Sequence, residues 1–476
     1  MKKNRRLALR TRTGYGAVEL GMSAAEVMLL FYLLEFYTKY VGLRADLAGF
    51  ALALALLWDA ITDPLMGGIS DRTRSRFGKR RPYIFLGMIV LAAGIMLVFS
   101  HPDFTSQSGK FFFLLFGYIV TNTGMTIIAV PHAALAGEIS FDRNERTELF
   151  GWRMVFRTFG LLVAALLPGL LVMYFQERVG MSRTLTSRWV GIAVIVTGLI
   201  TFFSMAKIDA PAEPLKRKVR ALEGTVLAEL HGFFRGLRAV ATNKAFLPLL
   251  LTYVIAYGGR TLNTSVALYY YEIRLELSDR EIHVNIIGLF TVVVCLSIGA
   301  WVLLSRKYGK KLPGFWGAFS LGVTTIIIYP IMPPGQVMWP MLLGSVLGGF
   351  LAGSIIIFES LVADVVDYDE LITGEHREGL YFGCWTMTTK VSRAVTLAFT
   401  GLVLDRIGLK EGQQVQPDEV GEWLAIIYGP VVGGCFLVAA LIFLTMPLTD
   451  ARHRRIQVLL TRRRAHKRRM AEKGAL

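Results

Sequence analysis

The sequence predicts an all-α membrane protein with twelve transmembrane helices arranged as two halves of six. Three observations lead to this fold class: a strongly apolar composition, twelve separate apolar stretches, and a basic turn that occurs once in each half. The chain has 476 residues, of which 54% are hydrophobic and only 18% charged, with a mean hydropathy of +0.50. Soluble domains carry about 25% charged residues. A soluble enzyme, a disordered chain and a fibre are therefore excluded, and three cysteines are too few for a secreted disulfide scaffold.

The apolar stretches divide evenly around one long polar segment, because a helix needs about 20 apolar residues to cross a bilayer. Candidate spans in the first half lie near 16–38, 46–68, 83–100, 111–136, 153–175 and 189–206. Those in the second half lie near 245–271, 283–304, 314–333, 337–362, 381–404 and 422–447. The predicted units are an N-terminal six-helix half at 1–206, a cytoplasmic central loop at 207–244, a C-terminal six-helix half at 245–447 and a basic cytoplasmic tail at 448–476.

A short basic turn occurs at the same place in each half. Residues 76–82 read Arg-Phe-Gly-Lys-Arg-Arg-Pro between spans two and three, and residues 307–313 read Lys-Tyr-Gly-Lys-Lys-Leu-Pro between spans eight and nine. A positively charged loop alone would explain the basic residues but not the matching Gly and Pro. The repeat therefore indicates two parallel halves related by an axis along the membrane normal.

The net charge of +17 predicts the orientation in the membrane. With both termini inside, about 38 of the 52 Lys and Arg lie on the cytoplasmic side and about 10 outside, as the positive-inside rule requires. We expect an integral protein of the cytoplasmic (inner) membrane with cytoplasmic termini, and no nucleic-acid partner. A cleaved signal peptide is not expected, since the first long apolar stretch carries Glu19, Glu26 and Glu35. The basic run 462–469 is expected either to contact anionic inner-leaflet lipid or to be a solvated tail.

Two aspartates and a lysine within the spans form a candidate cation site. Asp59 and Asp63 are four residues apart and hence on one helix face. Two carboxylates so close in a low dielectric repel each other, so one takes a proton or a cation binds between them. Sodium prefers such oxygen ligands, which makes this pair the candidate metal site if the coupling ion is not a proton. Lys390 needs an anionic partner, and Thr386, one turn earlier, offers a hydroxyl oxygen. The alternative is an aspartate pair solvated at a helix end.

A second group of polar residues outlines a cavity between the halves. Glu19, Ser23 and Glu26 recur at i, i+4 and i+7 and form one polar stripe on span one. Taken singly, such residues are more often helix–helix contacts, but together they indicate a binding cavity in which an aromatic side chain can stack on a ring. The remaining candidates for substrate binding are Asn122, Thr126, Arg153, Tyr257, Asn263 and Trp385.

Three separated motifs carry a resemblance to a known family. The first is WDAITDP at 58–64, continuing as DRTRSRFG at 71–78, and the second runs from Val-Pro to Glu over 130–138. The third is ADVVDY at 363–368, followed after a short interval by Lys390. On these motifs the chain resembles, over its full length, the glycoside-pentoside-hexuronide:cation symporters, the melibiose-permease branch of the major facilitator superfamily.

The resemblance implies roles for particular residues of this chain. It implies that Asp59, Asp63 and Thr386 bind the coupling cation with Lys390 beside them, and that Arg153 borders the sugar site. It further implies a cytoplasmic charge network that holds the inward side shut when the protein opens outward. The members of that network are Arg146, Asp364, Asp367 and Arg377.

The chain departs from the melibiose-permease pattern at the substrate site. The two aspartates that hold the galactoside in those permeases correspond to Ser23 and Ala129 here, and a tryptophan corresponds to Ala133. A galactoside is therefore not assumed, and Glu19 or Glu26 would take over the polar role.

These observations predict a secondary active transporter that couples entry of Na⁺ or H⁺ to uptake of a sugar, glycoside or hexuronide by alternating access. The alternatives are a cation-coupled carrier of lysophospholipid or another amphiphile, and a transporter-like membrane sensor that moves no substrate. An enzyme is not expected, because the spans contain no H-E-x-x-H, G-x-S-x-G or other pairing of a nucleophile with a base. We expect a monomer with a small-molecule substrate and no cofactor besides the coupling ion.

Overall fold

The computed structural model is helical throughout the part of the chain that it describes. That part comprises residues 7–73, 75–140, 143–175, 179–205, 240, 243–333, 335, 338–375, 377–413 and 415–473, without the side chains of 137, 143–144, 146, 172–175, 179–180 and 464–473. No β-strand occurs in these ranges. The predicted central loop at 207–244 lies almost wholly outside the described residues.

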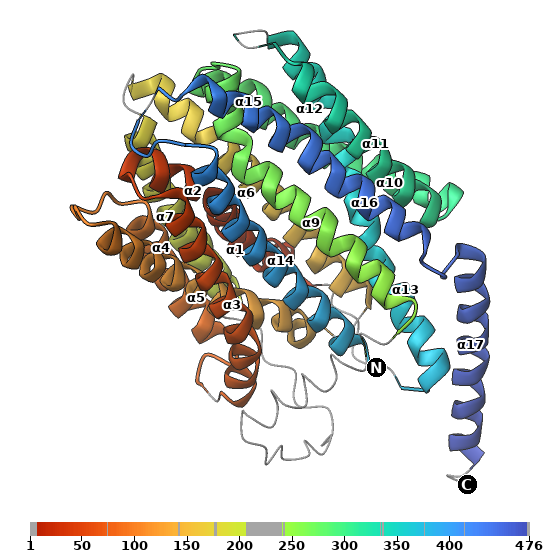
Figure 1. The fold of residues 1–476 in the computed structure, drawn as a ribbon. Coiled ribbons are helices and arrows are strands. Elements are labelled where there is room, and N and C mark those ends of the chain that lie inside the picture. Colours follow the sequence, from red (N-terminus) through yellow and green to blue (C-terminus); the bar gives the residue numbers. More distant parts are fainter. Residues whose placement is uncertain are drawn as a thin grey trace.

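Six helical spans form the first half of the chain (Figure 1). They overlap the six spans predicted from the apolar stretches. The first begins as α1 (Leu9–Val27) and continues through two π-helical turns and α2 (Leu33–Glu35) to Val41. The others are α3 (Ala45–Arg72), α4 (Arg81–Val98), α5 (Gln107–Ile139), α6 (Arg143–Phe175) and α7 (Val179–Ser204).

Six further spans and a terminal helix form the second half. The spans are α9 (Phe246–Tyr269) with the turn Tyr270–Arg274, the π-helical turn Glu281–Gly288 with α10 (Leu289–Tyr308), α11 (Lys311–Ile331), α12 (Met338–Ala352) with α13 (Ile356–Thr373), α14 (Glu378–Arg406), and α15 (Asp418–Ile426) with α16 (Val432–Leu444). The tail forms α17 (Asp450–Lys473). Ten spans are apolar enough to cross a membrane by composition alone. The other two are α9 and α14, which carry several of the polar residues singled out in the sequence, and the predicted twelve-helix fold is confirmed.

Small residues let the helices approach one another closely, as is usual between helices in a membrane. Gly160 of α6 lies so near α1 that a Cβ on it would be 2.2 Å from the carbonyl oxygen of Leu20. Gly94 of α4 meets Thr121 of α5 in the same way, with a Cβ only 2.8 Å from the Thr121 backbone. Both glycines therefore set how closely the helices of the first half can pack.

The two halves meet at one end of the bundle. We call the end where α1 begins and α16 ends the terminal face, and the end where α3 begins the opposite face (Figure 1). Near the opposite face, Gly49 of α3 packs on Gly401 of α14, and Leu166 of α6 lies against Gly288. The ion pairs and hydrogen bonds that join the halves between described side chains all lie from mid-bundle to this face. In this conformation the halves are thus closed together on the opposite face.

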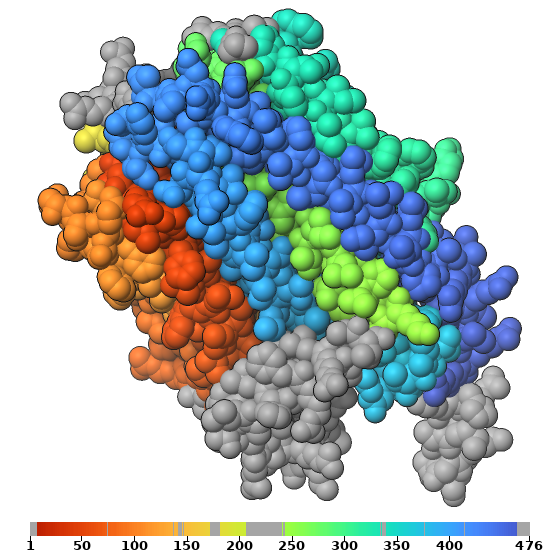
Figure 2. Space-filling model, in the orientation of Figure 1, coloured from red at the N-terminus to blue at the C-terminus, as the bar shows by residue number. Residues whose placement is uncertain are grey.

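Helix α14 fills the seam between the halves. It packs against α3 of the first half and α9 of the second, and Figure 2 shows it lying between these two helices along the visible side of the molecule. Residues on α14 can therefore reach side chains of both halves, which makes this helix a natural place for groups that sense their relative position.

The glycine contact between α3 and α14 leads to a stability prediction. A Cβ at Gly401 would lie 2.3 Å from the carbonyl oxygen of Ala45, which is backbone and cannot turn aside. Gly401→Ala should therefore force the helices apart and destabilise the protein by about 1 to 3 kcal/mol, seen as a lower unfolding temperature in detergent. Gly434→Ala is the matched control, because a Cβ there meets open space. Equal unfolding temperatures for the two variants would contradict the close approach.

Candidate functional site

The predicted carboxylate pair and lysine are in direct contact at the seam between the halves. Lys390 of α14 lies with its ammonium nitrogen 2.7 Å from Oδ2 of Asp59, and it also contacts the Asp63 carboxylate. Both aspartates come from α3, and Asp59 is 9% exposed. The i, i+4 spacing therefore does place both carboxylates on one face, and that face meets α14. We call Asp59, Asp63 and Lys390 the ion triad.

A threonine of α5 completes the surroundings of the ion triad. The Thr126 hydroxyl lies 2.6 Å from Oδ1 of Asp59 and 2.9 Å from Oδ1 of Asp63. One hydroxyl carries one proton, so it can donate to only one of these oxygens at a time. The sequence assigned Thr126 to the substrate cavity, whereas the structure places it on the two carboxylates. The position of Thr126 in the middle of a long apolar helix indicated a functional polar residue. The spacing of residues along α5 could not show which neighbouring helix it faces.

Thr386 is not brought to the carboxylates. Its hydroxyl donates to the Phe382 carbonyl of its own helix at 3.0 Å, and the side chain is exposed. The oxygens that surround the Lys390 ammonium are thus those of Asp59 and Asp63, with Thr126 behind them. Two carboxylates and a hydroxyl are the hard oxygen ligands that a sodium ion prefers, and either carboxylate alone could hold a proton.

The polar stripe of α1 is matched by two arginines of α6. Glu19 is 2% exposed and accepts a hydrogen bond from Nε of Arg153 at 2.5 Å. Two helical turns further along α1, Glu26 pairs at 2.9 Å with Arg157, which lies one turn further along α6. Ser23 lies between these two pairs, and its hydroxyl is 2.7 Å from the Glu19 carbonyl oxygen of its own helix and 3.0 Å from the Arg157 carbonyl oxygen of α6, so it belongs to the α1–α6 contact.

A buried histidine of α5 joins the Glu19 pair. Nδ1 of His132 is 3.4 Å from Oε1 of Glu19, and Nε2 is 2.7 Å from the Tyr15 carbonyl oxygen. The His132 ring also stacks on Tyr15 with 4.4 Å between ring centroids. Sequence reasoning missed His132, although it follows Pro131 in one of the family-like motifs. A lone histidine on an apolar helix gives no signal of its partners without the fold.

The second half contributes an aromatic group and a carboxylate. Trp385 of α14 stacks on Tyr253 of α9 with 4.0 Å between ring centroids, and Tyr257 lies beside Tyr253 at 5.6 Å. The Tyr253 hydroxyl donates to Glu359 of α13 at 3.0 Å. Glu359 is exposed and has no cationic partner within 4 Å among the described side chains, and sequence reasoning did not single it out.

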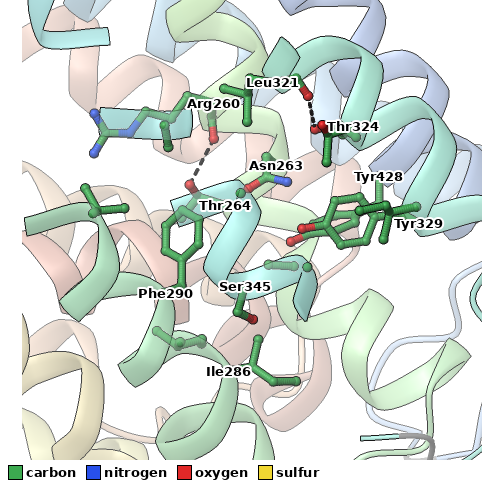
Figure 3. Close-up of a pocket in the computed structure, with 18 of the residues that line it drawn as sticks. Arg260, Asn263, Thr264, Ile286, Phe290, Leu321, Thr324, Tyr329, Ser345 and Tyr428 are labelled. Atoms are coloured by element: carbon green, nitrogen blue, oxygen red, sulfur yellow. Dashed lines mark hydrogen bonds between the residues drawn. The ribbon is translucent and has the colours of Figure 1, made fainter. Parts of the chain in front are cut away.

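Two of the predicted substrate residues lie in other surroundings. Asn263 lines a cavity of about 150 Å³ formed mainly by helices of the second half, where Figure 3 shows it near Tyr329 and Tyr428. Asn122 of α5 is 4% exposed, and its amide nitrogen has no hydrogen-bond partner among the described residues. The predicted substrate residues therefore form several groups rather than one continuous set.

The acidic residues of the predicted cytoplasmic network have partners in their own half. Asp364 of α13 pairs with Lys310 at 2.8 Å, and His453 of α17 lies 3.2 Å from Asp367. Arg377 pairs with its neighbour Glu375, and the side chain of Arg146 lies outside the described residues. The resemblance implies this network for a conformation that is closed on the terminal face. The present conformation is closed on the opposite face, so the network stays a prediction.

The fold and the site together define a class of protein. Two six-helix halves with paired carboxylates and a lysine at the seam between them are features of a secondary transporter. The sequence pattern of the family described as "MFS/sugar transport protein" matches residues 14–450. The chain belongs to this family of the major facilitator superfamily.

Relatives and solved structures agree with this assignment. The chain is 24% identical to the inner membrane symporter YicJ of Escherichia coli, with 92% of each chain covered, and 23% identical to the glucuronide carrier protein homolog of the same organism, with 97% of each covered. It is 24% identical to the sodium-dependent lysophosphatidylcholine symporter 1-A of Danio rerio, covering 90% of this chain and 85% of that one. The nucleoside transporter NupG has the same fold, with a TM-score of 0.65 and 12% identity over 92% of this chain and 100% of that one.

The buried pair between α1 and α6 leads to a second prediction. Arg153→Gln would leave the Glu19 carboxylate buried without its ion pair, so the variant should be destabilised by about 3 to 5 kcal/mol. Arg12→Gln removes a pair with Glu148, whose side chain is 45% exposed, and should cost about 1 kcal/mol or less. The unfolding temperatures of the two purified variants are compared. Similar losses of stability would show that the buried Glu19–Arg153 pair stabilises the protein no more than the exposed pair does.

Proposed function

We propose that the protein is a cation-coupled symporter that uses entry of Na⁺ or H⁺ to drive uptake of a sugar, glycoside or hexuronide by alternating access. The observation that carries the proposal is the ion triad, because it joins α3 of one half to α14 of the other through charge. The named symporters among the relatives support it, and one of them is sodium-dependent by name. A covalent reaction is not part of the proposal.

The coupling step follows from the charge of the triad. Two carboxylates and one ammonium leave a net charge of −1, which a bound Na⁺ or proton cancels. A cation at Asp59 and Asp63 competes with Lys390 for the same oxygens, and Thr126 offers a further oxygen. Ion binding therefore changes the contact between the halves, which is the contact that rocking must alter. Thr386 donates its hydroxyl proton to the Phe382 carbonyl, which leaves the lone pairs of its oxygen for a cation that lies within reach.

We propose a polar substrate rather than an amphiphile because of the charged groups of α1, α6 and α13. Arg153 and Arg157 with their carboxylates, and Glu359 opposite them, offer donors and acceptors to hydroxyl or carboxylate groups of a sugar. Trp385 is stacked on Tyr253 and 7% exposed, so a sugar ring would pack on it only where the other side of its ring becomes open. Carriage of lysophospholipid, which the name of the Danio rerio relative raises, would instead call for an apolar cavity open to the lipid.

The terminal face is proposed to be the cytoplasmic face of an inner membrane, on the strength of the Lys and Arg distribution. The present conformation is then closed to the outside. When the cytoplasmic face closes, Asp364 and Asp367 would exchange their present partners for Arg146 and Arg377. The basic run 462–469 would then lie near anionic lipid headgroups.

The coupling proposal predicts the behaviour of the aspartate variants. Asp63→Asn should abolish gradient-driven accumulation, because a single carboxylate can no longer compensate both Lys390 and a cation. Exchange of substrate without an ion gradient should persist. Uptake into proteoliposomes, screened across sugars, uronides and lysolipids under imposed Na⁺ or H⁺ gradients, measures both activities. Wild-type accumulation by Asp59→Asn and Asp63→Asn would reject the site.

The lysine has a separate prediction. Lys390→Ala leaves two carboxylates without their ammonium, so transport should fall at least about tenfold while the protein still inserts in the membrane. Lys307→Ala is a control, because Lys307 lies near the terminal face at the end of α10, where it contacts the ring of Tyr308. Normal transport by Lys390→Ala would show that Lys390 is only a packing residue.

A further inference from the structure

A fully buried arginine lies between two carboxylates near the opposite face. Arg183 of α7 is 0% exposed. Its Nη2 atom is 2.8 Å from Oδ1 of Asp279, and its Nε atom is 3.3 Å from Oε2 of Glu35. The guanidinium also lies over the ring of Tyr32 at 4.6 Å from the centroid. An arginine with this degree of burial is held only because both carboxylates compensate its charge.

This cluster crosses the boundary between the halves. Arg183 and Glu35 belong to the first half, whereas Asp279 precedes the π-helical turn that opens the second span of the second half. Two neighbouring contacts also cross: Thr38 shares a hydrogen bond of 2.6 Å with the Tyr269 hydroxyl, and Lys39 pairs with Glu272. The opposite face is thus fastened by polar contacts as well as by the glycine packing of α3 on α14.

Each side of the Arg183–Asp279 contact has a second partner in its own half. Arg183 would keep Glu35 if the halves separated, and Asp279 would keep His283, whose Nε2 atom is 3.2 Å from its Oδ1 atom. Burial alone would raise the pKa of Asp279, but the charge of Arg183, with a smaller contribution from the neighbouring His283 ring, holds that pKa well below its usual value. The contact therefore stays ionised in neutral solution, and separation leaves Arg183 paired with Glu35 and Asp279 beside the His283 ring.

An open cavity adjoins the Asp279 side of this contact. A cavity of about 990 Å³ opens near the opposite face and is lined by groups of both halves, among them Asp279, Glu272, Lys39 and Arg188. Water in this cavity can hydrate Asp279 as it leaves Arg183, which lowers the cost of separation. The arrangement therefore has the two properties of a gate. It holds the two halves together when it is closed, and it can open without leaving a buried charge uncompensated.

We propose that the Arg183–Asp279 ion pair is the outer gate of this transporter, and that the gate opens when Asp279 separates from Arg183 into the adjoining cavity while it stays beside His283. The proposed orientation makes the opposite face the outer one, but the separation itself depends only on the contacts between the halves. The gate predicts that loss of Asp279 shifts the protein toward the conformation open on the opposite face.

Labelling of a single cysteine tests the gate. Leu166→Cys, in a chain whose own Cys295, Cys384 and Cys435 are replaced by serine, places a thiol where α6 meets Gly288 beneath the gate. A membrane-impermeant maleimide applied from the opposite face should react at least about fivefold faster when Asp279→Asn is added, a typical size for a conformational coupling. Asp279→Glu keeps the charge and should restore slow labelling.

The matched control is an exposed contact between the halves on the same face. Asp405→Asn removes the contact with Arg44, which is 4.0 Å long and half exposed, and should change the labelling rate less than about twofold. The measurement needs neither substrate nor cation, so its outcome is independent of the coupling experiments. Equal labelling of Asp279→Asn and the parent, with both proteins folded by size-exclusion chromatography, would overturn the gate.

Discussion

The contact between Lys390 and the two aspartates of α3 is the interaction on which the rest of this structure depends. A charge near the bilayer centre costs about 2.5 to 3.5 kcal/mol on insertion scales. Asp59 and Asp63 carry this cost in α3, and Lys390 carries it in α14. Their mutual compensation ties the two helices together, and the glycines near the opposite face allow the same helices to touch.

The same constraint explains where the other buried charges lie. Glu19 and Arg153 come from α1 and α6 of one half, so their pair moves as part of a rigid unit. Arg183 and Asp279 come from different halves, so their pair changes whenever the halves rock. The first kind of pair stabilises a half, and only the second kind, together with the ion triad, can respond to a change of conformation.

The sequence was sufficient for the fold and for part of the site. Apolar stretches determine the spans, and a spacing of four residues determines a common helix face, so the twelve helices and the pairing of Asp59 with Asp63 could be predicted. Rotation of one helix against another has no such local signature. For that reason the direction of the Thr386 hydroxyl and the position of Thr126 on the carboxylates could not be foreseen.

The predicted start of the sixth span was too late in the sequence, and for that reason the Arg183 cluster was not predicted. The predicted sixth span began at residue 189, which left Arg183 in a loop where basic residues need no explanation. In the structure α7 begins ten residues earlier, at Val179, and Arg183 becomes an intramembrane charge that requires partners. Its partners lie 148 and 96 residues away in the sequence. Contacts at such separations depend on the fold as a whole, and no local pattern of residues reports them.

The ion pairs on the two faces of the bundle indicate how an exchange of ion-pair partners would lower the free-energy cost of moving between conformations. On the terminal face, Asp364 pairs with Lys310 of its own half. On the opposite face, Asp279 pairs with Arg183 of the other half, and His283 of its own half lies 3.2 Å from it. Removing one partner of a buried ion pair costs about 3 to 5 kcal/mol, whereas exposed pairs are worth about 0.2 to 1 kcal/mol. An acidic residue that keeps a neighbour in its own half is less costly to separate from the other half. In the proposed cycle, rocking exchanges one set of ion pairs for another, and ion binding at the seam acts on the contact that this exchange alters.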